Sequence, residues 1–265
     1  MTPISLDLPD HLTQARAELL AQVAEHNEAA HGDDFLGLIL SGSAGRGLAT
    51  DRSDLDVYVV LTDDGAADRR TTKSSAVDEI PISLSELEEV PPFGSDYWWY
   101  RWSFAWAPVV LDRTQGELSM LAERQATVSQ EEARSILVTH DRLDGWVNYA
   151  YRALKSDRDG RTLERRLDAA ESMPWALDTI FTLHGRVRPY HKYLPWELQH
   201  HPLPGWTAEE LLGLLERTLD GDPEALRETF ARIEGMCREF DASLSEPVLL
   251  PIIDGWGSEL ALFRG

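Results

Sequence analysis

The sequence predicts an α+β domain with a mixed sheet over residues 1–125, followed by an α-helical bundle over residues 126–265. Two observations lead to this fold class. The first half contains short apolar runs rich in β-branched residues, separated by polar turns. The second half changes to helical patterns with recognisable helix-start signals. A chain of 265 residues is long enough for two ordinary domains, so both can be accommodated.

In the first half, an apolar stripe closed by Gly32 predicts a helix over residues 10–31. The later elements follow in order: buried strands at 35–40 (FLGLIL) and 55–61 (LDVYVVL), a polar loop at 62–75, a third strand at 78–84, and a fourth strand with a turn at 107–118. The third strand contains Pro81, which has no N–H to donate, so we expect an edge or a break there.

In the second half, capping signals mark the helix starts. The expected helices are one that opens at Ser129 with Glu132 and runs towards Lys155, one over 161–184, one that opens at Thr207 with Glu210, and one from Asp222-Pro223 to about Phe240. The lone cysteine, Cys237, falls in the last of these and is expected in or near the core.

The composition excludes several classes of partner. With 46 acidic and 25 basic residues the net charge is −21, which disfavours nucleic acid as a partner and is compatible with a cationic substrate. No apolar run approaches the length of about 18 residues that a membrane helix requires. The first residues lack a signal-peptide pattern, and one cysteine excludes an internal disulfide, so we expect a cytoplasmic protein.

The stretch from Leu40 to Leu61, LSGSAGRGLATDRSDLDVYVVL, carries the chemistry. It is not a P-loop, because no Lys-Ser/Thr follows its glycines, and it lacks the third glycine and the helix of a dinucleotide-binding fingerprint. Asp54 and Asp56 lie two residues apart at the start of a strand and therefore share a face, with their Cα atoms about 7 Å apart. Two like charges so placed favour a hard divalent cation such as Mg²⁺.

Upstream, the small residues Gly42 and Ser43 follow the first strand. Backbone N–H groups and the Ser43 hydroxyl could hold a phosphate there, and Arg46 is placed to add positive charge. Gly-Ser, then ten residues, then Asp-x-Asp resembles the DNA polymerase β-like nucleotidyltransferase superfamily. The resemblance implies a polymerase β-like fold for the first domain, two Mg²⁺ ions on Asp54 and Asp56, and a triphosphate held by the Gly-Ser loop.

The resemblance also implies a third carboxylate on a neighbouring strand. Asp78 and Glu79 are the candidates, and they lie on opposite faces of the expected strand at 78–84. If Ile80 and Ile82 pack into the core, Glu79 occupies the polar face. We therefore expect Glu79 to complete the metal site or act as base, with Asp78 as the alternative.

Two further segments bear on the substrate. Residues 177–198 resemble a segment of bacterial antibiotic-modifying nucleotidyltransferases, which implies that Lys192 faces the nucleotide phosphates; a solvated loop lysine is the alternative. Residues 96–106, DYWWYRWSFAW, gather aromatic side chains that could stack on a base, although core packing is the preferred interpretation.

Together these features predict a Mg²⁺-dependent enzyme that transfers a nucleoside monophosphate from an NTP, with ATP as the expected donor, to a hydroxyl of a small molecule. An aminoglycoside-like antibiotic is the preferred acceptor, because a cationic sugar suits an acidic protein. The alternatives are a protein-modifying enzyme of the toxin–antitoxin type and a nucleotide-binding relative without catalysis.

Overall fold

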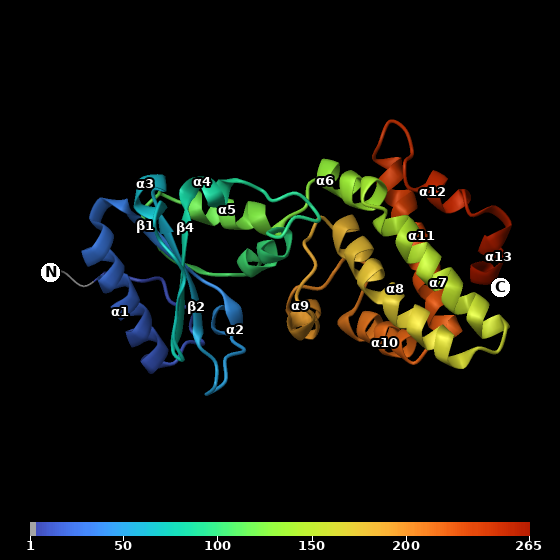
Figure 1. The fold of residues 1–265 in the computed structure, drawn as a ribbon, viewed down its shortest axis with the longest axis horizontal. Coiled ribbons are helices and arrows are strands. Elements are labelled where there is room, and N and C mark those ends of the chain that lie inside the picture. The colour runs from blue at the N-terminus through green and yellow to red at the C-terminus, as the bar shows by residue number, and fades with distance from the viewer. Residues whose placement is uncertain (1–3) are drawn as a thin grey trace. The chain divides into compact units, whose positions relative to one another are not determined.

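The structure is a computed structural model that describes residues 4–265, so the first three residues of the expected domain over 1–125 lie outside the described part. The chain divides into two compact units, Met1–Thr127 and Val128–Gly265. The division falls two residues after the boundary expected between residues 125 and 126. The first unit is α+β and the second is helical, as predicted (Figure 1).

A five-stranded mixed sheet forms the centre of the first unit, with the strand order β3-β4-β2-β1-β5. β2 and β4 are parallel, and every other neighbouring pair is antiparallel. The strands are β1 (Phe35–Leu40), β2 (Leu55–Leu61), β3 (Thr72–Lys73), β4 (Val77–Ser83) and β5 (Val109–Asp112). The strands expected at 35–40 and 55–61 match β1 and β2, whereas the loop expected over 62–75 contains the short strand β3.

Helices cover both faces of this sheet, which explains the continuous apolar runs of β1 and β2. The helical segments of this unit are α1 (Gln14–His31), η1 (Gly32–Asp34), α2 (Gly42–Gly45), α3 (Asp63–Ala66), α4 (Leu84–Glu88), η2 (Trp98–Phe104) and α5 (Glu117–Ala126). α1 packs through Leu20 and Val23 on the face that carries Val57. Side chains of α4, η2 and α5 pack on the opposite face, which carries Tyr58 and Val60.

Pro81 lies on β4 beyond the end of its ladder with β3. The antiparallel pairing of β3 with β4 joins only Thr72 to Glu79 and Lys73 to Asp78. Pro81 itself pairs in register with Val59 of β2. The missing N–H of Pro81 therefore interrupts no β3 bond. The strand itself is not at the edge of the sheet as one expectation had it, because β4 lies between β3 and β2.

The second unit is a set of helices around one apolar core. They are α6 (Gln130–Arg134), η3 (Ser135–Thr139), α7 (Arg142–Arg158), α8 (Thr162–Leu183), η4 (His191–Tyr193), α9 (Leu194–His200), α10 (Ala208–Leu219), α11 (Pro223–Ala242), α12 (Leu250–Asp254), η5 (Gly257–Leu260) and α13 (Ala261–Arg264). α7 and α8 form a helical hairpin (Figure 1). The expected capping boxes at Ser129 and Thr207 are confirmed, and Cys237 is fully buried.

The single helix expected from Ser129 towards Lys155 is wrong. The chain passes from α6 into a π-helical segment, η3, and then breaks at Asp141, whose φ of 53° is left-handed. No glycine or proline stands at residues 135–141, so the sequence contains no signal for this break. Within residues 4–265, no helix is long and apolar enough to cross a membrane.

Candidate functional site

The Gly-Ser loop packs directly against β2. After β1, the backbone N–H of Ser41 donates to the carbonyl of Asp56 over 2.8 Å, and the chain then makes the single turn α2. Gly42 has a φ of 60°, and a Cβ atom at this position would lie 1.9 Å from Oδ2 of Asp56. Only glycine fits here, both because of its backbone angle and because the Asp56 carboxylate occupies the space of a side chain.

Asp56 has a second carboxylate beside it on the neighbouring strand. In the parallel ladder of β2 and β4, Asp56 is the register partner of Asp78. Such partners point to the same face of a sheet, with Cα atoms about 4.8 Å apart. Asp54 precedes Asp56 by two residues, and the N–H of the intervening Leu55 already bonds to the Ala76 carbonyl. Gly42, Asp56 and Asp78 therefore lie together, with Asp54 next along the chain.

Glu79, the expected third carboxylate, lies on the other face of the sheet. Its register partner on β2 is Val57, which packs with α1. Asn27 of α1 donates its side-chain N–H to Oε2 of Glu79 over 2.7 Å. Asp78, the alternative, therefore shares the face of Asp56, and Glu79 does not. Which of the two completes a metal site stays a prediction. Ile80 and Ile82 do pack against the core, but on the same face as Asp56 and Asp78.

Arg46 is placed differently from the phosphate-binding role expected of it. Its side chain is only 5% exposed. The guanidinium donates to the carbonyls of Gly42, Trp102, Ser103 and Ala105 and lies 4.2 Å from the centre of the Trp102 ring. Arg46 therefore connects the loop to the segment that contains η2 through hydrogen bonds, and its side chain does not extend into solvent where it could meet a phosphate.

The oxygen donors fit a magnesium ion bound together with a nucleotide, although they do not form a complete metal centre. Mg²⁺ in such sites is bound by one or two carboxylates and by substrate phosphates, and keeps several waters. Asp54, Asp56 and Asp78 supply that kind of ligand. Among residues 4–265, however, no three His, Cys, Asp or Glu side chains lie close enough together to hold a metal.

Lys192 belongs to the second unit, on the exposed turn η4, where its ammonium lies 4.6 Å from the centre of the Tyr193 ring. Just before it, Arg188 pairs with the buried carboxylate of Asp178 over 2.6 Å and contacts His191 over 2.7 Å. Burial raises the pKa of Asp178, and the nearby arginines offset part of that rise. Arg188 thus anchors this segment to α8, and the phosphate-binding role of Lys192 stays a prediction.

The aromatic segment has a function in the packing of the loop that sequence reasoning missed. Trp98, Trp102 and Phe104 are buried, as preferred from the sequence. In addition, the Ser41 hydroxyl donates to the carbonyl of Ser103 over 2.7 Å, beside the bonds from Arg46. In the sequence, the only hint of this link is the polar residue Ser41 directly before Gly42. The sequence does not show that Ser41 is buried, so the link could not be predicted.

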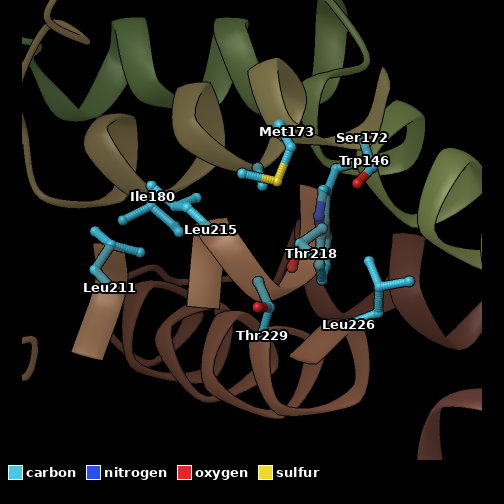
Figure 2. A pocket seen from close by; sticks show the side chains of 10 residues that line it. Trp146, Ser172, Met173, Ile180, Leu211, Leu215, Thr218, Leu226 and Thr229 are labelled. Atoms are coloured by element: carbon cyan, nitrogen blue, oxygen red, sulfur yellow. The ribbon is translucent and has the colours of Figure 1, made fainter. Parts of the chain in front are cut away.

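A small cavity lies in the helical unit, between α7, α8, α10 and α11 (Figure 2). It is lined by apolar side chains such as Trp146, Met173 and Ile180, and by Ser172, Thr218 and Thr229. About 10 Å³ is available to a water-sized sphere, which suits about one water molecule. A nucleotide or a sugar does not fit there, and the candidate site remains the loop and the carboxylates of the first unit.

Comparison with solved structures gives distant likenesses. Among solved structures, the chain is similar to a nucleotidyltransferase-like protein from Exiguobacterium sibiricum, with 14% sequence identity, a TM-score of 0.36, and coverage of 91% of this chain and 85% of that one. No protein-family model matches the chain, and no curated protein matches it. The functional interpretation therefore depends on the residues of this chain.

Proposed function

We propose that the protein is a Mg²⁺-dependent nucleotidyltransferase that moves a nucleoside monophosphate from an NTP, with ATP as the expected donor, to a hydroxyl of a small molecule. The observation that carries the proposal is the packing of Gly42 against the Asp56 carboxylate. It joins a loop of small residues, suited to phosphate, to a carboxylate that suits a divalent cation. Asp78 would supply the third carboxylate, and its register pairing with Asp56 supports this choice.

Each residue has a definite task in this reaction. Asp54 and Asp56 would hold Mg²⁺, which supplies charge neutralisation for the phosphates and lowers the pKa of the acceptor hydroxyl. The Ser43 hydroxyl and the N–H groups of the loop would orient the triphosphate. The acceptor oxygen forms a bond to the α-phosphorus, the bond from that phosphorus to the bridging oxygen breaks, and pyrophosphate leaves. Asp78 would accept the proton of the hydroxyl.

The acceptor proposed is a cationic small molecule such as an aminoglycoside. A net charge of −21 supports this choice, because it attracts cations and repels polyanions. The absence, within residues 4–265, of three gathered metal ligands favours a second candidate: a protein that binds nucleotides but does not transfer them.

The test is turnover with labelled ATP, Mg²⁺ and a panel of aminoglycosides and lincosamides, followed as pyrophosphate release and labelled product. Transfer to at least one acceptor, lost in Asp54→Asn and in Asp56→Asn, supports the enzyme. Nucleotide binding without pyrophosphate release from any acceptor supports the non-catalytic candidate. Turnover that survives both substitutions contradicts the proposed site.

A further inference from the structure

Arg46 is a buried cation that bonds two stretches of chain to each other. Nη1 donates to the Gly42 carbonyl over 2.9 Å, on the loop. Nη2 lies 3.2, 3.1 and 2.5 Å from the carbonyls of Trp102, Ser103 and Ala105, in the aromatic segment. The guanidinium also lies over the Trp102 ring. A planar guanidinium presents five donors in a rigid fork while it stacks on a ring, whereas the ammonium of lysine is a compact point charge with three donors.

The bond to Gly42 connects Arg46 to the Asp56 carboxylate. Gly42 stands against Oδ2 of Asp56, so a shift of the Gly42 backbone changes the space that this carboxylate occupies. Ser41, the preceding residue, is held at both ends, by the Asp56 carbonyl through its N–H and by the Ser103 carbonyl through its hydroxyl. The position of the loop beside Asp56 thus depends on the carbonyls of residues 102–105.

We propose that Arg46 is a positioning residue for the Mg²⁺–nucleotide site, which fixes Gly42 against Asp56 and does not itself bind phosphate. This inference rests on the proposed function. Arg46 is the only basic residue of the segment 40–50. In this proposal it supports the Asp56 carboxylate and does not contact the ligand. Groups that orient metal ligands in this way commonly change metal affinity about 10- to 100-fold when they are substituted.

The experiment compares wild type and Arg46→Lys by calorimetric titration with a nonhydrolysable ATP analogue, once with Mg²⁺ and once with EDTA. Positioning predicts that Arg46→Lys weakens binding about tenfold or more with Mg²⁺, and leaves unchanged the weaker, metal-free binding that high concentrations of the analogue show with EDTA. Equal weakening in both buffers would mean that the guanidinium meets the phosphates directly. No change in either buffer would mean that Arg46 serves packing alone. Both of these results overturn the proposal.

Arg101→Lys is the matched control. Arg101 is 1% exposed, lies over the Trp98 ring at 4.5 Å, and donates to backbone carbonyls, but to those of Gln125 and Thr127 at the end of α5. It should lower the urea midpoint much as Arg46→Lys does, because both lose buried bonds of the same kind, while its Mg²⁺-dependent binding stays at the wild-type value. A similar loss of binding in Arg101→Lys would reduce the Arg46 effect to general destabilisation and overturn the proposal.

A second measurement keeps the inference separate from the proposed function. If wild type binds no nucleotide in either buffer, the proposed function fails, and hydrogen exchange of the free protein then tests Arg46. Arg46→Lys should speed exchange of the amides of Gly45, Gly47 and Leu48, which bond within the loop. Arg101→Lys should leave them unchanged. Unaltered exchange in Arg46→Lys shows that Arg46 does not hold the loop.

Discussion

At the scale of the residue, Asp56 and Asp78 stand in register on neighbouring parallel strands, while Glu79 faces α1. The sequence correctly put Asp78 and Glu79 on opposite faces and Ile80 and Ile82 against the core. It could not say which face carries Asp56, because helices cover both faces of this sheet and apolar residues therefore lie on each. The sequence also shows that Arg46 is positively charged but not where its side chain points, and in the structure it donates to buried carbonyls.

The variant Asp78→Asn, compared with Glu79→Gln, tests which of these two carboxylates accepts the proton. If Asp78 accepts the proton, this substitution lowers kcat about 100-fold or more. Glu79→Gln, which keeps an oxygen for Asn27, should leave kcat close to the wild-type value, because Glu79 lies on the face of the sheet opposite Asp56. Pyrophosphate release at saturating ATP measures both. A larger loss in Glu79→Gln than in Asp78→Asn would return the role to Glu79.

Gly42→Ala tests the contact between the loop and Asp56. A left-handed φ costs a non-glycine residue about 1–2 kcal/mol, and here the new methyl group must also displace the carboxylate. The free energy of unfolding should therefore fall further than in Gly116→Ala, and Mg²⁺-dependent nucleotide binding should weaken. Gly116 is left-handed, with a φ of 101°, and has nothing within 4 Å of an added Cβ, so it reports strain alone. Urea denaturation of both variants makes the comparison, and equal losses would argue against the contact.

At the scale of the element, strands and helix starts could be predicted from the sequence because local chemistry determines them. β1 and β2 follow their β-branched runs, and α10 begins at the Thr207 capping box. The break at Asp141 and the two-residue strand β3 were missed, since both depend on tertiary packing and neither has a propensity signal of its own. Capping was therefore predictable, and the interruption of a helix was not.

Thr207→Ala measures what the capping box contributes. The hydroxyl of Thr207 accepts the N–H of Glu210, and the Glu210 carboxylate accepts the N–H of Thr207. Its loss should lower the free energy of unfolding of the helical unit by about 1 kcal/mol. Glu209→Gln, in the same first turn but outside the capping box, should change it less. If the two variants have the same urea midpoint, the box contributes nothing beyond the helix dipole.

At the scale of the whole molecule, two units have their own cores, and the acidic charge is a property of the entire chain. The expectation that nucleic acid is disfavoured as a partner comes from the net charge alone, and it stays a prediction. The acceptor could not be predicted further, because a net charge selects a class of molecule and not its shape. Lys192 and Asp56 belong to different units, so their cooperation stays a prediction.

Stability should fall on mild acidification. Burial, followed by the charges of Arg188 and Arg186, lowers the pKa of His191 and His201 below the ordinary 6.5. Below pH 6.5 the unfolded chain binds protons at these positions more readily than the folded chain does, so stability is lost as the pH falls through this window. The urea midpoint should drop between pH 7.5 and pH 5.5, and less so in a His191→Gln, His201→Gln double variant. An identical drop in that variant would exclude these two histidines as the cause.

We propose that the Gly42–Asp56 contact marks a Mg²⁺–nucleotide site. The decisive experiment is calorimetric titration of wild type and Asp56→Asn with a nonhydrolysable ATP analogue, with Mg²⁺ and with EDTA. Wild type should bind the analogue more tightly with Mg²⁺, and in Asp56→Asn this binding should be lost or weakened at least about tenfold. Equal affinity in the two proteins, or no binding by wild type, would show that the contact marks no such site.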